Sequence, residues 1–250
     1  MSFIKHNASR FKDQLLKEVA GLELLRGVIE SNDIKLRIPR VINVSEHQLE
    51  LERVKMVSPN SEMMATFGKE LAKLHSIPSK RAGLEEDNYI GLNPQENGLY
   101  QDWGSFFYEK RLKFQVEMVT SPRVRESFLE VLSNNRERLI RWLNEHCEHA
   151  SLVHGDLWSG NVMFNEQNVW LIDPAVYFGD REVDLAMTEM FGGFNHHFYD
   201  AYDDILPRSQ EYGTKKVIYN LYHYLNHYNL FGDGYLSACQ RGIELIKDLK

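Results

Sequence analysis

The sequence predicts an α+β fold in which a small, sheet-containing N-terminal lobe precedes a larger, mainly helical C-terminal lobe. Two runs rich in branched and apolar residues, 40–45 and 47–56, are separated by a short polar turn and favour a pair of strands. Beyond residue 60, apolar residues recur every three or four positions through most of the chain, which indicates amphipathic helices. We therefore expect one lobe over residues 1–58 and a second over residues 59–250.

The N-terminal lobe is expected to contain a helix among its strands. A brief strand covers residues 2–5, and a helix follows over 9–29 with Ser9 as its N-cap. The helix is predicted from five apolar residues at helical spacing: Phe11, Leu15, Val19, Leu22 and Leu25. A second helix over 60–77, which ends before Pro78, marks the start of the larger lobe.

The C-terminal lobe is expected to continue with an ordered loop over 80–102, because three glycines and a proline lie there among polar and aromatic residues. Loops of that length within a compact domain are usually functional. The remaining predicted helices cover 103–119, 123–147, 181–194 and 215–231, and short strands cover 151–154, 161–164 and 168–173. The aromatic stripe Tyr219, Tyr222 and Phe231 is interpreted as core.

Composition excludes several functional classes. The 250 residues carry a formal net charge of −7, so the chain offers no broad basic surface for nucleic acid or anionic lipid. We find no run of eighteen apolar residues and no apolar leader at the N-terminus, and we expect a cytoplasmic protein. Cys147 and Cys239 lie far apart without a CxxC pattern, which indicates packing residues rather than a disulfide or a zinc site.

Three oxygen-bearing side chains near the middle of the chain have the arrangement that phosphoryl transfer requires. Asp156 and Asn161 lie five positions apart on a predicted loop, and Asp173 ends a predicted apolar strand twelve positions later. In such reactions one Asp orients the attacking hydroxyl and accepts its proton, while an amide oxygen and a second carboxylate hold magnesium. Hard oxygen ligands suit that cation. The sequence therefore predicts a kinase-like site.

Two other interpretations of this segment remain. His154 lies beside an Asp and could act as a general base, but no Ser or Cys nucleophile lies in an elbow context, so we interpret His154 as a structural brace. Asp156 and Asn161 taken singly would fit a capped turn, because Asp, Asn and Gly all form turns. Their combination with the strand-ending Asp173 favours the phosphoryl-transfer site.

The segments "VHGDLWSGN" and "LIDPAVYFGDREVDLAMTEMFGGF" resemble the fructosamine kinase family, within the wider aminoglycoside phosphotransferase and protein-kinase-like fold. The HGDxxxxN pattern with a downstream IDP is typical of the wider superfamily, while the Trp inside the loop and the FGDREVDLAM segment are specific to the family. The likeness covers nearly the whole chain, including "NYIGLNPQENGLYQDWGSFFYEKRL" and "LYHYLNHYNLFG". It implies a two-lobed kinase that uses ATP and Mg²⁺.

Carried over by position, the resemblance implies Asp156 as the catalytic base and Asn161 and Asp173 as magnesium ligands, as the chemistry of these residues also indicates. Lys5 resembles the lysine that binds the α- and β-phosphates, and Glu18 resembles its ion-pair partner. From the residues alone, a pair of solvated surface charges is the favoured interpretation of Lys5 and Glu18, and the family resemblance reverses that preference.

The resemblance also implies supporting roles. The stretch "LELERVKM" resembles the linker between the lobes, where backbone groups near Glu52 and Val54 would meet adenine; a plain strand end is the alternative. Asp184 resembles the buried helix Asp that hydrogen-bonds the catalytic loop. The N-terminal lobe would then bind nucleotide, and the C-terminal lobe would carry the catalytic loop, the metal and the acceptor.

For the acceptor, the resemblance points to the loop around Asn88, Gln95 and Asn97 and to Trp158 beside the base. A sugar with a secondary amine needs polar groups for its hydroxyls and an aromatic face for its ring or cation. Gln95 and Asn97 could equally cap the loop backbone, and Trp158 could be a core residue.

The N-terminus departs from the pattern of this fold. Kinases of this type place a glycine-containing hairpin before the strand that bears the lysine, whereas only four residues precede Lys5 here. We expect an N-terminal lobe without that hairpin, either truncated or naturally short, with weaker ATP binding and some futile hydrolysis. The strand edge at residues 2–7 could pair with a second copy, which makes a homodimer a hypothesis.

The predicted function is ATP- and magnesium-dependent phosphorylation of a hydroxyl on a ketosamine, a fructosamine or ribulosamine that is free or protein-bound. One alternative keeps the chemistry and changes the acceptor to an aminoglycoside, choline or another hydroxylated amine. A second alternative is a catalytically silent nucleotide-binding protein, which the absent hairpin would explain.

Overall fold

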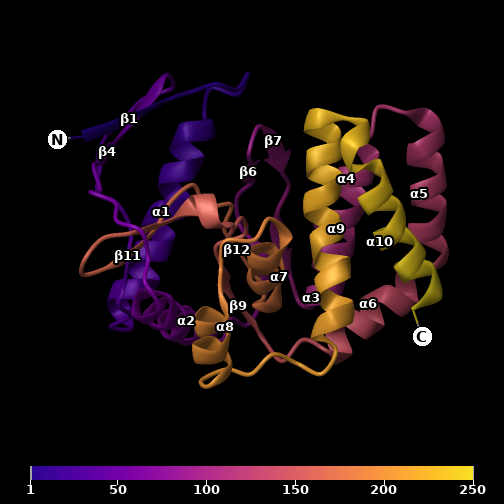
Figure 1. The fold of residues 1–250 in the computed structure, drawn as a ribbon. Helices are drawn as coiled ribbons and strands as arrows, with labels where there is room; N and C mark the ends of the chain where they lie inside the picture. Colours follow the sequence, from indigo (N-terminus) through magenta and orange to yellow (C-terminus); the bar gives the residue numbers. More distant parts are fainter. Residues whose placement is uncertain (1, 250) are drawn as a thin grey trace.

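The computed structural model describes residues 2–249, which form a sheet-rich N-terminal part and a helical C-terminal part (Figure 1). The N-terminal part consists of β1 (Ser2–His6), α1 (Gln14–Ser31), β2 (Leu36–Arg37), β3 (Val41–Val44) and β4 (Gln48–Glu52). Strands β1, β4 and β3 form an antiparallel sheet with β4 in the centre. This register places Lys5 opposite Leu49.

The middle of the chain begins with α2 (Ser61–His75), whose first turn is capped by Asn60 through a hydrogen bond from the Met63 backbone N–H. The expected loop over 80–102 contains four short strands: β5 (Ala82–Leu84), β6 (Asn88–Ile90), β7 (Asn93–Gln95) and β8 (Gly98–Tyr100). Helical segments follow as α3 (Trp103–Phe106), the π-helix η1 (Phe107–Lys113), α4 (Phe114–Glu117), α5 (Pro122–Asn134) and α6 (Arg136–Glu145).

The last hundred residues alternate strands and helices before ending in helices. They comprise β9 (Ala150–Val153), η2 (Ser159–Asn161), β10 (Val162–Phe164), β11 (Val169–Leu171), β12 (Tyr177–Asp180), α7 (Glu182–Met190), α8 (His196–Asp203), α9 (Tyr212–Phe231), η3 (Asp233–Tyr235) and α10 (Leu236–Asp248). One sheet has the order β8-β5-β12-β9, and another has the order β10-β11-β2. The β10–β11 hairpin therefore pairs, through β2, with the N-terminal part.

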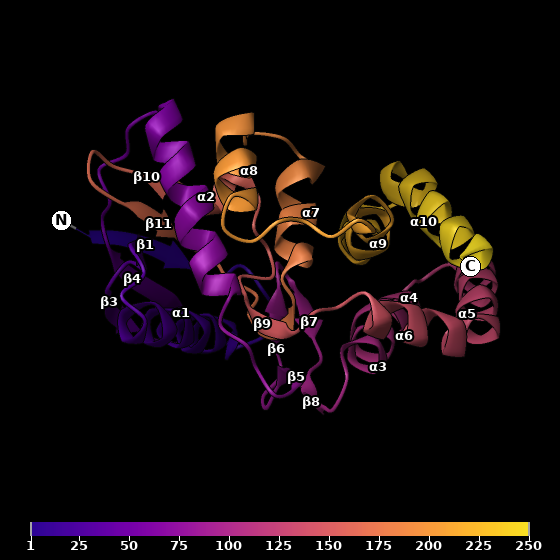
Figure 2. The ribbon, with the colours of Figure 1, turned by 90° about the horizontal axis from the view of Figure 1, so that it is seen from below.

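Two hydrophobic clusters stabilise this arrangement. One joins α1, α2, the β10–β11 hairpin and α8, and it buries Leu22, Phe67 and Phe198 completely. The other lies among the C-terminal helices. Viewed from below, α3, α4, α5, α6, α9 and α10 gather at one end of the molecule, β1, β3, β4 and α1 lie at the other, and α7 and α8 lie between them (Figure 2).

One glycine decides how closely α2 and α8 approach. A Cβ atom at Gly68 of α2 would overlap the backbone carbonyl oxygen of Phe198 in α8. Glycine at position 68 has no side chain, so the two helices can approach closely and bury more apolar surface between them. Burial of apolar surface is favourable in proportion to its area.

The first helix begins later than its periodicity predicts. α1 starts at Gln14 rather than at residue 9, and its N-cap is Asp13. Ser9 instead forms a turn in which its backbone N–H donates to Asn7 Oδ1 at 2.9 Å, so the predicted N-cap is wrong. Phe11 lies outside the helix and packs on Tyr89 with ring centroids 5.1 Å apart. Local side-chain hydrogen bonds have outweighed the apolar spacing.

Other boundaries also differ from the predictions. The helix predicted over 123–147 is interrupted at Asn135, between α5 and α6. Strands β2 and β12 were not predicted, and they have only two and four residues. Helices α8 and α10 were not predicted either. Tyr219 and Tyr222 are buried as expected, whereas Phe231 is 67% exposed and is not core.

None of the helices within residues 2–249 is both long enough and apolar enough to span a bilayer. Cys147 and Cys239 are both free thiols; Cys239 is buried and Cys147 is half-buried.

Candidate active site

The loop after β9 carries the central candidate residue, Asp156. Gly155 turns the chain there with a φ of +80°, and a Cβ atom at this position would overlap the carbonyl oxygen of Ala175. The backbone N–H of Ala175 in turn donates to the carbonyl of His154 at 2.9 Å. Only glycine combines that conformation with such a close approach, so the HGD sequence is required for the loop to pass this point.

Asp156 and Asn161 contact each other directly. The Nδ2 atom of Asn161 donates to the backbone oxygen of Asp156 at 2.8 Å and to its Oδ2 atom at 3.2 Å. Burial raises the pKa of the Asp156 carboxyl to about 7, although the hydrogen bond from Asn161 favours the ionised form. A carboxyl group with a pKa near neutrality is suited to accept a proton from a substrate hydroxyl.

Asp173 follows β11 in a left-handed conformation with a φ of +52°, which is uncommon for a residue other than glycine. Its Oδ1 atom lies 3.0 Å from Lys5 Nζ, and Lys5 Nζ lies 2.8 Å from Glu18 Oε2. Backbone strain of this kind often accompanies functional sites. Here the turn directs Asp173 toward the lysine on β1.

Lys5 therefore faces two carboxylates. Burial would lower the pKa of Lys5, but the attraction of Glu18 and Asp173 outweighs it, and the pKa lies above its ordinary value. Glu18 is the more buried of the two carboxylates, and burial raises its pKa to about 7. The ammonium is therefore held charged at the edge of the site, in the state that binds phosphate.

One pocket of about 200 Å³ brings the predicted groups together. Its lining includes Lys5, Glu18, Asp156, Trp158, Asn161 and Asp173. These residues come from β1, α1, the loop after β9 and the end of β11. The pocket thus joins the N-terminal sheet to the loops of the C-terminal part.

The oxygen atoms in this pocket fit a magnesium ion. Both hydrogen bonds of Asn161 to Asp156 use its Nδ2 atom, which leaves the amide oxygen available for another ligand. Within residues 2–249, no three His, Cys, Asp or Glu side chains form a cluster that would hold a metal by themselves. Magnesium commonly takes only one or two protein oxygens and completes its shell with phosphate and water.

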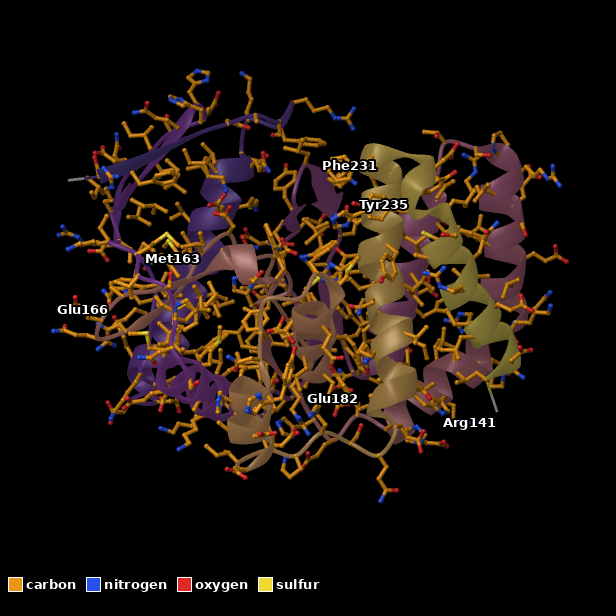
Figure 3. All side chains as sticks on the ribbon, in the orientation of Figure 1. Arg141, Met163, Glu166, Glu182, Phe231 and Tyr235 are labelled. Atoms are coloured by element: carbon orange, nitrogen blue, oxygen red, sulfur yellow. The ribbon has the colours of Figure 1, made fainter. Side chains whose placement is uncertain are left out.

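A second pocket of about 830 Å³ adjoins the first and shares Asp173 with it. It is lined by Glu52 at the end of β4, by Val54 of the linker that follows, and by apolar side chains that include Met56, Met163 and Ile172. Figure 3 labels Met163, which lies on β10 of the β10–β11 hairpin. A mostly apolar space beside a peptide linker suits a planar base such as adenine.

The backbone of the loop rests on Asp184 of α7. Asp184 accepts hydrogen bonds from the backbone N–H groups of His154 at 2.7 Å and Gly155 at 2.9 Å, and a ring nitrogen of His75 lies 3.3 Å away. Burial opposes ionisation of Asp184, but these hydrogen bonds outweigh it and lower its pKa. His154 is completely buried, and its Nε2 atom lies 2.9 Å from the carbonyl oxygen of Ile172, so it connects the loop to β11.

A buried ionic cluster next to Asp184 was not predicted from the sequence. Lys215 Nζ on α9 lies 2.8 Å from Asp180 Oδ2 and 2.9 Å from Glu182 Oε2. Tyr219 donates to Asp180 at 2.7 Å, and Ser209 donates to Glu182 through both its backbone and its hydroxyl. The sequence signal for this cluster was the mixture of charged and apolar residues in "GDREVDLAM", which suggests buried charges but does not identify their partner on α9. Figure 3 labels Glu182 of this cluster.

Two of the predicted acceptor residues do not reach the pocket. Gln95 and Asn97 are buried, and their Nε2 and Nδ2 atoms donate to Asn88 Oδ1 at 2.7 and 2.9 Å. Tyr222 donates to Gln95 Oε1 at 2.6 Å, and Arg111 donates to Asn97 Oδ1 at 2.8 Å. The polar atoms of Gln95 and Asn97 are thus occupied by these contacts, and neither residue is in the lining of the pocket.

Asn88 and Trp158 remain at the pocket. Asn88 is in the pocket lining, although its Nδ2 atom donates to the Val176 carbonyl at 2.9 Å. Trp158 is 39% exposed and is not a core residue. Its ring lies over Gly160, where a Cβ atom would overlap it, so the absence of a side chain at position 160 leaves room for the indole.

Comparison with known proteins gives one consistent family. Residues 1–248 match the family described as fructosamine kinase. The chain is 36% identical over 250 residues to the "Probable ketoamine kinase" of Vibrio vulnificus, an alignment that covers 98% of this chain and 84% of that protein. It is 38% identical over 183 residues to the "Protein-ribulosamine 3-kinase, chloroplastic" of Arabidopsis thaliana, covering 72% of this chain and 56% of that protein.

Solved structures agree with this match. A "putative fructosamine-3-kinase" from Thermobifida fusca superposes with a TM-score of 0.82 at 26% identity, covering 98% of this chain and 85% of that one. The ADP-bound aminoglycoside phosphotransferase APH(2'')-Ib gives a TM-score of 0.62 at 15% identity, covering 99% of this chain and 87% of that one. That second likeness is one of fold alone. Together they confirm the predicted α+β, protein-kinase-like fold.

Proposed function

This chain belongs to the fructosamine kinase family, and we propose that it transfers the terminal phosphate of ATP to a sugar hydroxyl of a fructosamine or ribulosamine. The observation that carries the proposal is the convergence of Lys5, Asp156, Asn161 and Asp173 on one pocket. That pocket adjoins a larger apolar pocket at the linker, where the base of ATP would lie.

In the proposed reaction, Asp156 orients the acceptor hydroxyl and takes its proton. The hydroxyl oxygen forms a bond to the γ-phosphorus, and the bond between that phosphorus and the oxygen bridging to the β-phosphate breaks, so that ADP leaves. The half-buried position of Asp156 supports this role, because its carboxyl has a pKa of about 7 and can both hold and release a proton.

The other residues would bind and orient the phosphates. Lys5, held by Glu18 at 2.8 Å, would exchange its contact with Asp173 for one with phosphate oxygens. Asn161 and Asp173 would hold Mg²⁺, which when bound neutralises phosphate charge. Asp184 fixes the backbone of His154 and Gly155 and thereby the position of Asp156.

The acceptor is proposed to lie beside Trp158. A ketosamine carries a protonated secondary amine next to its sugar ring, and an exposed indole face attracts such a cation. Trp158 is partly exposed and lines the same pocket as Asp156, and its ring lies over Gly160, which has no side chain to displace it.

The test is ADP release in the presence of ATP, Mg²⁺ and the ribulose or fructose adduct of a lysine derivative. We expect Asp156→Asn to lower the rate by at least about a hundredfold, the scale of general-base catalysis. Asp204→Asn, at an exposed position on the end of α8, is the matched control and should retain the wild-type rate. An unchanged rate in Asp156→Asn would refute the role of Asp156, and turnover of choline or an aminoglycoside alone would refute the acceptor.

A further inference from the structure

A row of aromatic rings leads away from Trp158, from the residue that follows α7 to the C-terminal part of α9 and the η3 turn. We call it the aromatic ridge, and it consists of Phe191, His227, Phe231 and Tyr235. Phe191 lies 6.2 Å from Trp158 and 5.3 Å from His227, measured between ring centroids. His227 lies 5.6 Å from Phe231 and 5.0 Å from Tyr235. The ridge thus begins at the proposed acceptor site.

Two of the four ridge side chains are exposed, and His227 and Tyr235 are half-buried. Phe191 is 46% exposed, and Phe231, at 67%, is the most exposed large apolar residue in the part of the chain described. Phe231 is the last residue of α9 and Tyr235 ends the η3 turn that follows; Figure 3 labels both. Contiguous exposed apolar surface that adjoins an active site usually marks a binding surface.

The charge of the ridge favours a cationic occupant. No Lys or Arg belongs to the ridge, and burial lowers the pKa of His227, so this imidazole is neutral at physiological pH. Asp233 is exposed and lies between Phe231 and Tyr235 in the sequence. Aromatic faces and one carboxylate together attract an ammonium or guanidinium group on an apolar stem.

We propose that the aromatic ridge binds the part of the ketosamine beyond its sugar, namely a glycated lysine side chain and the peptide that carries it. The proposal rests on the proposed function, since it assumes that the sugar lies at Asp156 and Trp158. The amine that links sugar and lysine then points outward along Phe191 and His227. Backbone and flanking side chains of the peptide reach Phe231, Tyr235 and Asp233.

The experiment compares two acceptors that differ only beyond the amine. One is the ribulose adduct of methylamine, and the other is the ribulose adduct of a lysine within a short peptide that has blocked ends and an arginine beside the lysine. The measured quantity is the ratio of kcat/KM for the peptide adduct to kcat/KM for the methylamine adduct. We expect Phe231→Ala to lower this ratio about fivefold and Asp233→Asn to lower it about twofold, as loss of a stacked ring and of one surface charge implies.

Ile205→Ala is the matched control, because Ile205 is 42% exposed and lies after α8, outside the ridge. Its ratio should equal that of the wild type. Since Phe231 is so exposed, Phe231→Ala should fold normally, which a thermal melt will verify. A ratio unchanged in Phe231→Ala, with both adducts phosphorylated, would overturn the ridge as a peptide site and leave the proposed function standing.

Two further outcomes also decide the proposal. If the wild-type protein phosphorylates neither adduct, both the ridge and the proposed function fail. If Phe231→Ala instead abolishes self-association that light scattering detects in the wild type, the ridge is a contact between copies of this chain, and its assignment to the peptide is wrong.

Discussion

The loop that carries Asp156 is supported from two sides, and the two supports differ in physical character. On the α7 side, Asp184, Asp180, Glu182 and Lys215 are almost completely buried. On the β1 side, Lys5 contacts Glu18 and Asp173 at the edge of a pocket, where the side chains of Lys5 and Asp173 are 31% and 42% exposed. Glu18 keeps one buried oxygen, Oε1, without a hydrogen-bond partner within residues 2–249.

Because of this difference, we expect the α7 side to contribute mainly to stability and the β1 side mainly to phosphate binding. Buried charges that are fully paired cannot lose a partner without a large penalty, so the α7 side holds the catalytic loop in one position. Ion pairs at a pocket edge contribute little to stability and can be exchanged, so the β1 side is free to bind phosphate. Substitutions on the two sides should therefore affect different measurements.

The largest expected effect is on stability, from Lys215→Met. Loss of this ammonium leaves Asp180 and Glu182 buried without their cation, and we expect the free energy of unfolding to fall by about 3–5 kcal/mol in urea titrations. Lys216→Met is the control, because Lys216 is partly exposed and pairs with Glu189; it should cost less than about 1 kcal/mol. Equal losses in both variants would contradict the distinction between the two sides.

Lys5→Met should affect activity and spare stability. We expect kcat/KM for ATP to fall about a hundredfold, the scale seen when one charged group that stabilises a transition state is removed. The free energy of unfolding should change by less than about 1 kcal/mol. Lys12→Met, at an 82% exposed position on the same part of the chain, should change neither quantity. A loss of stability comparable to that of Lys215→Met would show that the β1 side is also structural.

Low pH should reduce the free energy of unfolding through His223, which lies buried on α9. This imidazole is buried, its Nδ1 atom has no hydrogen-bond partner within residues 2–249, and burial lowers its pKa to about 3. Below the unfolded-state pKa of about 6.5 only the unfolded chain takes up this proton, so stability falls as the pH falls toward the folded pKa. Between about pH 7 and about pH 5, the proton uptake of His223 in the unfolded chain should lower the free energy of unfolding by about 2 kcal/mol.

The check is the pH dependence of urea unfolding in His223→Gln, which should be shallower than that of the wild type by about that amount. His196→Gln, at an exposed position, is the control and should leave the slope unchanged. A steeper slope in His223→Gln would contradict the assignment.

The smallest effect is expected from Glu18→Gln. The amide retains a hydrogen bond to Lys5 but removes one negative charge, and we expect kcat/KM to fall about tenfold, as for a charge-assisted hydrogen bond replaced by a neutral one. Stability should not decrease, because burial already raises the pKa of Glu18 to about 7. Glu86→Gln, at the exposed partner of Lys17, should leave both quantities unchanged. A marked loss of stability in Glu18→Gln would contradict this view.

The sequence was most informative where the chemistry is local. Asp156 and Asn161 lie on one loop and Asp173 ends the next hairpin, so their spacing alone suggested a common site, and the structure places all three at one pocket. The Lys5–Glu18 contact joins a strand to the helix that follows it, 13 residues apart, and was suggested only by the family resemblance.

The sequence was least informative where the partner lies far along the chain. Asp180 and Lys215 are 35 residues apart, and Gln95 and Tyr222 are 127 residues apart, so no periodicity or local motif links them. Gln95 was therefore interpreted as a substrate contact, although tertiary packing places it under Tyr222. Phe231 was interpreted as core because its spacing on α9 matches that of buried residues, whereas its neighbours leave it exposed.

The most direct test of the account is phosphorus NMR of the protein with ATP, Mg²⁺ and the ribulose adduct of lysine. We predict that ADP and a new phosphomonoester signal grow together, because the phosphate moves from ATP to a sugar hydroxyl beside Asp156. Growth of ADP with inorganic phosphate alone, or unchanged ATP, would contradict it.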